Sequence, residues 1–584
     1  MAKTAGDILV QTLIDWGVDT IFGIPGDGIN GVIESLRERK DEIRFVQVRH
    51  EEAAAFAACA YAKFTGRLGV CLSTSGPGGI HLLNGIYDAK LDGQPVLAIT
   101  GLQHHDLLNT FTQQDVDLDK LFMDACAYSV RVMGAAHMQN VAEMACRIAL
   151  GYRQPTHITI PVDVQSQAVS KDARSERNLP DHVSNIMAPS GHLPDPKQLE
   201  RAAEILSNAK KPFILAGRGA LGARAELEAM AARLKAPVGM ALLGKGAIPD
   251  ESPYATGGVG LLGTRASQEA MEACDTLLIV GSCFPYVEFY PKPGSARAVQ
   301  IELDPKRIGL RTPVEAGLVG DSARVLEALL PLVRPNPSDA HLKAAQETMR
   351  DWRELMHERG TRRETPMKPQ VVTHELNKLL KDDAIIITDS GTITTWTARH
   401  IDMRPGQQFS CSGTLASMAC GLPYAIGAAT AYPNRQVVAV IGDGAMAMLM
   451  GDLVTLRKYN LDVKLIVIKN NTLGQIKWEQ MVFLGNPEYG CELEPIDFVR
   501  VAEGCGIRAV GIEDPERCGA QLRDALATPG PCLIECVVDP NEPPMPPKAT
   551  MKQALHLAQS LAKGTPGGAK IALTIASDVV RELV

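Results

Sequence analysis

Two loops in the last third of the chain carry side chains suited to holding a metal ion. The apolar run 436–441 leads into Gly442-Asp443-Gly444-Ala445, and the run 463–469 leads into Asn470-Asn471-Thr472-Leu473-Gly474. Backbone N–H groups at such a strand-to-helix turn attract an anion. Carboxylate, amide and carbonyl oxygens form a hard donor set that suits Mg²⁺ shared with phosphate. Either loop alone is a common turn, but the pair predicts a magnesium and phosphate site.

These loops can meet only where neighbouring parallel strands end at one edge of a sheet. Apolar runs alternate with helical patterns along most of the chain, which is typical of parallel sheets covered on both faces. We therefore expect an α/β fold with three doubly wound parallel-sheet domains. The expected domains are 1–185, 190–345 and 365–545, followed by a helical tail over 546–584.

The paired loops resemble the cofactor-binding motif of thiamine diphosphate enzymes, and the resemblance extends to about residue 540. Among these enzymes the chain is most similar to pyruvate oxidases and acetolactate synthases. The resemblance implies a pyrimidine-binding, a central and a diphosphate-binding domain, in that order. It implies that Asp443 and Asn470 bind Mg²⁺ through their side chains and Thr472 through its carbonyl oxygen. The cofactor-binding residues that it implies in these loops are Gly442, Gly444, Ala445 and Gly474.

A glutamate near the N-terminus matches the activating acid of this family. The family pattern is a strand, then Arg-His-Glu, then an alanine-rich helix, and here Arg49-His50-Glu51 precedes such a helix. In the family this glutamate hydrogen-bonds the aminopyrimidine ring and promotes loss of the C2 proton. The resemblance therefore implies that Glu51 is catalytic, in a dry site that raises its pKa. Taken alone, Glu51 could simply complement the dipole of the helix.

Two further positions match cofactor contacts of the family. Met418, within Ser417-Met418-Ala419-Cys420-Gly421, matches the bulky residue that supports the bent cofactor, although methionines more often fill cores. Gly391 follows the apolar run 384–388 and matches a glycine that contacts the diphosphate.

The expected substrate pocket combines three segments. The glycine-rich turn 74–79 matches a turn that lines the thiamine site, and it lacks the Lys-Ser/Thr ending of a phosphate-binding P-loop. Gln114 matches an active-site glutamine, but Gln113 and Asp115 replace the Phe and Glu that flank it in relatives. Because of these replacements, the resemblance does not define the shape of the pocket.

The segment after Gly474 bears on the choice of reaction. Pyruvate oxidases carry Glu five residues after this glycine, whereas acetolactate synthases carry Trp there. This chain has Glu479 at that place and Trp478 one residue earlier, which favours the oxidase branch. The resemblance also places Ile476 close to the reacting carbon, where it limits substrate size.

The central block matches the FAD-contacting segments of pyruvate oxidases in order. Gly217-Arg218-Gly219 follows an apolar run, and the later matches include Arg265, expected to pair with the FAD phosphates. A Rossmann-like domain without a ligand is the alternative. The residues implied in FAD binding are Gly217, Gly219, Thr264, Arg265, Asp304 and Asp321.

The resemblance implies oxidative decarboxylation of pyruvate or a similar small 2-keto acid, with electrons passing to FAD. The alternative is carboligation of 2-keto acids, as in acetolactate synthases. The family also implies a homotetramer, a dimer of dimers whose cofactor lies between domains of different subunits.

Composition excludes several classes of protein. The net charge of −8 provides no basic field for nucleic acid. The 13 cysteines form no CxxC pair, so neither a zinc site nor a disulfide framework is indicated. We expect a cytoplasmic protein without a transmembrane segment. The tail could be a lid, a peripheral membrane contact or simple packing.

Overall fold

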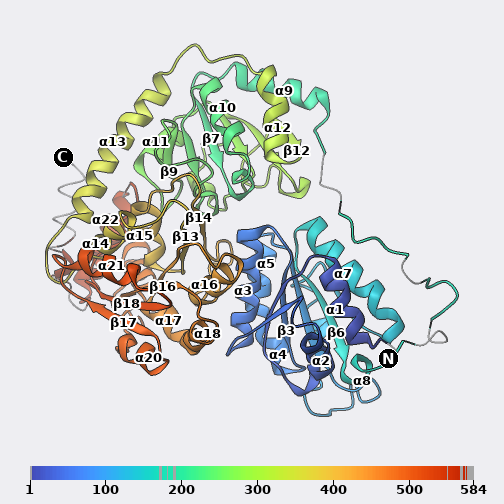
Figure 1. Cartoon of the computed structure of the whole chain (residues 1–584). Helices are drawn as coiled ribbons and strands as arrows, with labels where there is room; N and C mark the ends of the chain where they lie inside the picture. The colour runs from blue at the N-terminus through green and yellow to red at the C-terminus, as the bar shows by residue number, and fades with distance from the viewer. Residues whose placement is uncertain are drawn as a thin grey trace.

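The computed structural model describes residues 3–169, 174–179, 182–187, 192–548, 550–565, 568, 570–572 and 574. Three parallel six-stranded sheets, each flanked by helices, make up three domains along the chain (Figure 1). The expected α/β class with three doubly wound sheets is confirmed. Within the described residues, no helix is both long and apolar enough to cross a bilayer.

The N-terminal sheet has the strand order β2-β1-β3-β4-β6-β5. The order reverses between β1 and β3, and ligands of such folds bind beyond the carboxyl ends of strands at this switch point. The strands are β1 Thr20–Gly23, β2 Arg44–Gln47, β3 Gly69–Ser73, β4 Val96–Leu102, β5 Tyr128–Arg131 and β6 Thr156–Pro161. The helices are α1 Ala5–Asp15, α2 Asn30–Glu38, α3 Glu51–Thr65, α4 Pro77–His81, α5 Leu83–Leu91, α6 Leu118–Leu121, α7 Met138–Tyr152 and α8 Val162–Gln165.

The C-terminal sheet repeats this permutation in the order β14-β13-β15-β16-β18-β17, so its switch point lies between β13 and β15. The strands are β13 Ile385–Thr388, β14 Gln408–Ser410, β15 Val437–Gly442, β16 Val463–Lys469, β17 Arg508–Ile512 and β18 Cys532–Val537. The helices are α14 Pro369–Asn377, α15 Thr392–His400, α16 Gly421–Ala431, α17 Asp443–Leu449, α18 Leu453–Tyr459, α19 Gly474–Trp478, α20 Phe498–Gly504 and α21 Cys518–Ala527.

The central sheet has a different order, β12-β11-β10-β7-β8-β9. Counted within the domain this is the 3-2-1-4-5-6 order of dinucleotide-binding Rossmann folds, with the switch point between β7 and β10. The strands are β7 Pro212–Ala216, β8 Val238–Met240, β9 Ala255–Gly258, β10 Thr276–Val280, β11 Arg297–Glu302 and β12 Ala316–Val319. The helices are α9 Pro196–Ser207, α10 Arg224–Leu234, α11 Arg265–Glu272 and α12 Ser322–Leu329, and α13 Ala340–Gly360 leads to the C-terminal domain.

The N-terminal and C-terminal domains pack through α3 and α16, which lie side by side (Figure 1). Gly427 permits this close approach, because a Cβ there would lie 2.4 Å from the carbonyl oxygen of Ala57. Apolar side chains of both helices belong to one core that joins the two sheets. The predicted sites of these two domains are therefore carried by one rigid unit of the chain.

The tail begins with α22, Met551–Ala562, as the helical pattern predicts. It packs on the segment 474–486 of the C-terminal domain, where Ser560 Oγ donates a hydrogen bond to the Asn486 carbonyl at 2.9 Å. The rest of the expected helical tail, beyond residue 565, lies mostly outside the described residues.

Candidate active site

The predicted metal-binding loops lie beside each other because β15 and β16 are paired neighbours. Asp443 begins α17 directly after β15, and its side chain is buried. One carboxylate oxygen accepts hydrogen bonds from the backbone N–H groups of Asn470 at 3.1 Å and Asn471 at 2.6 Å. The sheet therefore brings Asp443 to the loop that carries Asn470 and Thr472, as the spacing predicts.

The oxygen atoms of these loops fit a divalent cation. Burial raises the pKa of the Asp443 carboxyl above its ordinary value, a cost that a bound cation would offset. The Oγ1 atom of Thr472 is buried and has no hydrogen-bond partner within the described part of the chain. The Asn470 amide oxygen accepts from the Thr472 N–H at 3.1 Å, and the Thr472 carbonyl accepts from Gly474 at 2.8 Å. This donor set has the hard oxygens that Mg²⁺ prefers.

The predicted diphosphate contacts surround the same loops. Gly391 caps α15 after β13, across the switch point from β15; its φ is +132°, and nothing lies within 4 Å of a Cβ built there. A Cβ at Gly444 would lie 3.4 Å from the terminal methyl of Met418, so the two predicted contacts are close. Gly391, Gly444 and Met418 thus lie around one region at the carboxyl edge of the sheet.

A second group of predicted residues lies at the switch point of the N-terminal sheet. Glu51 begins α3, and its side chain is 13 % exposed. Gln114 lies in the segment between β4 and α6. Its side-chain oxygen accepts a hydrogen bond at 2.6 Å from Oγ of Ser75, on the glycine-rich turn that follows β3. A Cβ at Gly78 would lie 3.4 Å from a carboxylate oxygen of Glu51, and one at Gly76 would lie 2.7 Å from Gln114 Cβ. The glycine-rich turn therefore brings Glu51 and Gln114 together.

The residues expected to select the reaction lie at the surface of the single chain. Ile476 is 45 % exposed on α19. Glu479 is exposed at the start of a π-helical turn over Glu479–Phe483, where its carboxylate accepts a hydrogen bond from Gln475 at 3.1 Å. Such π-helical turns are frequent at functional sites.

Several residues predicted to bind FAD have local structural roles. The side chains of Thr264, Asp304 and Asp321 accept hydrogen bonds from backbone N–H groups and cap the elements that follow them. The guanidinium of Arg265 lies 3.9 Å from Glu269, so its charge has an acidic neighbour on the same helix. These contacts leave FAD binding at these residues a prediction.

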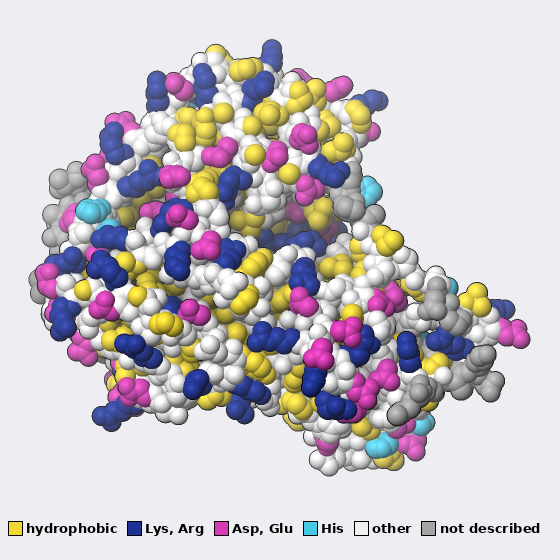
Figure 2. Space-filling model, viewed as in Figure 1, with side chains coloured by type: hydrophobic (Ala, Val, Ile, Leu, Met, Phe, Trp, Pro, Cys, Tyr) yellow, Lys and Arg dark blue, Asp and Glu magenta, His cyan; other side chains and the backbone are white. Residues whose placement is uncertain are grey.

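The glycines after β7 allow the loop after β7 to pass close to the loop after β10. A Cβ at Gly219 would lie 2.8 Å from the Cα of Gly281, which follows β10. Arg218, which lies between Gly217 and Gly219, is half-buried. Burial and repulsion from Arg153 lower the pKa of its guanidinium to about 10. Lys and Arg side chains gather in the hollow between the central and N-terminal domains (Figure 2). The sequence pattern did not predict a role for Arg218, although its place between two motif glycines could have marked it.

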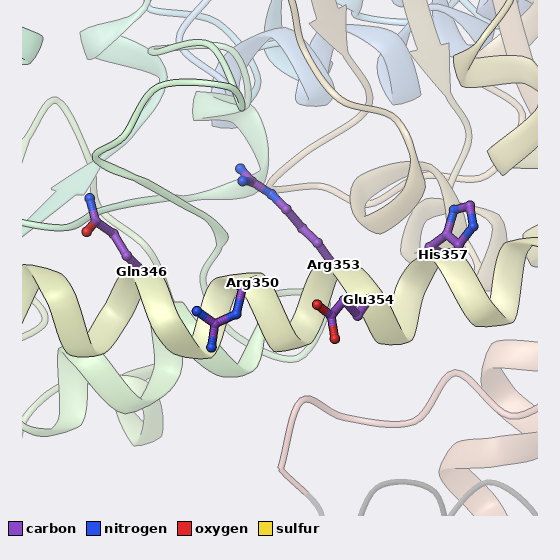
Figure 3. Close-up of a pocket in the computed structure, with 5 residues that line it drawn as sticks. All are labelled: Gln346, Arg350, Arg353, Glu354 and His357. Carbon is purple, nitrogen blue, oxygen red and sulfur yellow. The ribbon is translucent and has the colours of Figure 1, made fainter.

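The pocket of about 380 Å³ along α13 is separate from the predicted sites. Figure 3 shows its lining residues, which all project from this helix. Arg353 extends toward the loops of the central domain and donates a hydrogen bond to the Asp250 carbonyl at 2.6 Å. Gln346 similarly donates to the Pro253 carbonyl at 2.8 Å. These side chains connect α13 to the domain that it follows.

Comparison with known proteins identifies the family. The chain matches the N-terminal thiamine pyrophosphate-binding domain of thiamine pyrophosphate enzymes over residues 3–121. It matches their central domain over 199–329 and their C-terminal thiamine pyrophosphate-binding domain over 389–536. The chain therefore belongs to the thiamine pyrophosphate enzyme family, which agrees with the resemblance found in its motifs.

The similar proteins include representatives of both expected branches. YdaP of Bacillus subtilis (strain 168), provisionally named a thiamine pyrophosphate-containing protein, is 38 % identical over 96 % of each chain. The pyruvate oxidase of Lactiplantibacillus plantarum is 32 % identical over 92 % of this chain and 89 % of its own. A Methanococcus aeolicus protein, provisionally named an acetolactate synthase large subunit, is 30 % identical over 95 % of each chain. Identity alone does not separate oxidation from carboligation.

Proposed function

We propose that the protein is a Mg²⁺- and thiamine diphosphate-dependent enzyme that oxidatively decarboxylates pyruvate or a similarly small 2-keto acid. The observation that carries the cofactor assignment is the buried Asp443 at the β13/β15 switch point, beside Asn470 and opposite Gly391. Asp443, Asn470 and the Thr472 carbonyl would hold Mg²⁺. Met418 would support the cofactor from the adjacent segment.

The chain's own residues then divide the chemistry. Bound thiamine diphosphate supplies the electron sink for loss of CO₂. Glu51 holds or releases a proton at its carboxylate beside the cofactor ring. Gln114 orients the small substrate beside the glycine-rich turn, while Ile476 limits its size and Glu479 places a carboxylate at the entrance.

FAD is proposed as the electron acceptor. Two features support it: the Rossmann strand order of the central domain and the half-buried Arg218 at its switch point, which favours an anionic ligand. The test is the visible spectrum of the purified protein, with a count of the flavin released on denaturation. About one flavin per chain is expected, and a protein that lacks flavin after expression with excess riboflavin would contradict the assignment.

The relatives named as acetolactate synthases support carboligation as a second candidate. The position of Glu479, where those enzymes carry Trp, favours oxidation. Pyruvate turnover separates the two reactions, because oxidation reduces an added dye acceptor while carboligation forms a product that yields acetoin on acidification. Acetoin without dye reduction would overturn the oxidase proposal.

The cofactor assignment is tested by calorimetry with thiamine diphosphate and Mg²⁺. Asp443→Asn removes the charged ligand and should weaken binding by at least about a hundredfold, more than is usual for loss of an outer partner of a metal site. Asp524→Asn, at an exposed position of α21 in the same domain, is the matched control and should bind like wild type. Equal affinity in the Asp443 variant and wild type would contradict the proposed site.

A further inference from the structure

The carboxylate of Glu51 has a partner that its activating role does not explain. His81, the last residue of α4, lies with Nδ1 2.9 Å from a carboxylate oxygen of Glu51. The His81 side chain is 43 % exposed, whereas that of Glu51 is 13 % exposed. The imidazole therefore stands between a mostly buried acid and the surface.

A second imidazole fixes the orientation of the first. The ring of His50 stacks on that of His81, with centroids 4.5 Å apart and an angle of 26° between the planes. His50 is itself held as the cap of α3, where its Nδ1 accepts a hydrogen bond from the Glu52 N–H at 3.2 Å. The three side chains are close enough for a metal ion. Nitrogen lone pairs of nearly parallel rings do not converge on one point, however, so the stack fits a hydrogen-bonded relay better than a chelate.

We propose that His81 is a positioning residue that holds Glu51 and relays its proton. When the Glu51 carboxyl gives up a proton, His81 accepts it at Nδ1 and releases one from Nε2 to water; the reverse transfer recharges the acid. Each cycle moves one proton and leaves the imidazole neutral, so no other reactant is needed. This inference rests on the proposed function, because it assigns His81 to the acid that serves the thiamine site.

Several ionisable side chains lie around the contact between His81 and Glu51. The titratable groups nearest to His81 are Glu51, His50 and Glu52. Asp452 lies beside the loop of His50, where its carboxylate accepts a hydrogen bond from the Arg49 N–H at 2.8 Å. Asn84 donates to Glu52 at 2.6 Å, which holds that second acid on the α5 side.

The test separates binding, positioning and proton transfer. Calorimetry measures the affinity for thiamine diphosphate with Mg²⁺, and NMR in deuterium oxide measures exchange of its C2 proton in wild type, His81→Ala and His81→Asn. The Asn amide can donate a hydrogen bond to Glu51 from the place of Nδ1 but cannot relay a proton. We expect both variants to bind like wild type and to exchange at least about tenfold more slowly. Added imidazole should restore exchange in His81→Ala.

Other results would overturn the proposal in distinct ways. Wild-type exchange in His81→Ala would remove any role for this residue. Wild-type exchange in His81→Asn would reduce the role to positioning and refute the relay. If wild type itself fails to bind thiamine diphosphate, the proposed function fails first and the relay fails with it. Should His81→Ala not fold, the near-isosteric His81→Asn still decides the question.

Discussion

Two buried aspartates organise the loops around the predicted diphosphate site. Asp443 follows β15, and Asp389 follows the neighbouring strand β13. The two carboxylate oxygens of Asp389 accept hydrogen bonds at 2.7 Å from the N–H groups of Ser390 and Gly421. Asp389 therefore ties the loop that carries Gly391 to the start of α16, next to the segment of Met418. Burial raises the pKa of Asp389 to about 7.

This raised pKa predicts how stability changes with pH. The folded protein holds the Asp389 proton more tightly than the unfolded chain, whose value is near 3.8. The resulting stabilisation is complete below about pH 4 and is lost as the pH rises toward about 7. The Asn side chain in Asp389→Asn cannot titrate. The melting temperature of wild type should therefore fall relative to that of this variant between pH 5 and pH 8. Thermal unfolding of the cofactor-free protein measures the difference, and a gap between the two proteins that does not change with pH would contradict the assignment.

Residue motifs predicted one kind of site residue better than another. Asp443, Asn470 and Glu51 lie in short local patterns, and the structure places them at carboxyl ends of strands as expected. His81 and Arg218 were not predicted as site residues. Their significance depends on neighbours distant in sequence, such as Glu51 for His81 and Arg153 for Arg218, and a local pattern does not contain such contacts.

At the scale of elements, apolar runs predicted every interior strand except β8, whereas five of the six edge strands were missed and only the edge strand β2 was predicted. Buried parallel strands such as β7, β10 and β16 are continuous apolar runs, which a sequence shows directly. The missed strands are β5, β8, β9, β12, β14 and β17, and all except β8 form an edge of a sheet. An edge strand has one partner and more exposure, as in the pattern of β17, so its residues need not be apolar.

The tail supports the segment that carries Glu479. Ile571 is fully buried and packs with Trp478 and Met481 of this segment. His556 on α22 also hydrogen-bonds the carbonyl of Phe483, with Nδ1 and the oxygen 2.7 Å apart. The tail thus contributes packing and hydrogen bonds to the π-helical turn whose first residue is Glu479.

Removing the buried tail contact should loosen this turn. Ile571→Ala deletes a fully buried side chain and should weaken the local structure by about 2 kcal/mol or more. Amide hydrogen exchange in residues 479–486 should become faster, while exchange in β15 and β16 stays unchanged. Leu555→Ala, at a 57 % exposed position of α22, is the control and should leave exchange as in wild type. Unchanged exchange in Ile571→Ala would show that the tail does not support the turn.

At the scale of the molecule, a buried polar network joins the N-terminal and C-terminal domains beside α3 and α16. Lys63 donates hydrogen bonds to Asp92 at 2.6 Å and to the Cys411 carbonyl at 2.7 Å. Ser412 donates to Asp88 at 2.7 Å. Because these contacts and the shared core hold the two domains rigidly, the half-site of Glu51 and the half-site of Asp443 have fixed positions within one chain.

We propose that these half-sites are completed across subunits of a homotetramer built as a dimer of dimers. Glu51→Gln and Asp443→Asn should each be inactive alone. The two variants are unfolded, mixed and refolded together. Half of the randomly formed dimers should then be hybrids, and each hybrid has one intact site of two. About a quarter of wild-type activity should therefore return. Sedimentation verifies the assembly. If each chain carries a complete site, the mixture stays inactive, which would refute the shared site.

The sequence by itself determined the family, the order of the three domains and the points at which the predicted cofactor loops follow their strands. These features depend on short-range patterns: apolar runs that must be buried and glycines or acids that follow them directly. Only the tertiary structure decided which loops face each other. The repeated strand order places Asp443 next to Asn470 and across from Gly391, and the glycine-rich turn brings Gln114 to Glu51. Strand pairing and helix packing join residues far apart in the chain, so neither these contacts nor the pairing of His81 with Glu51 follows from local pattern.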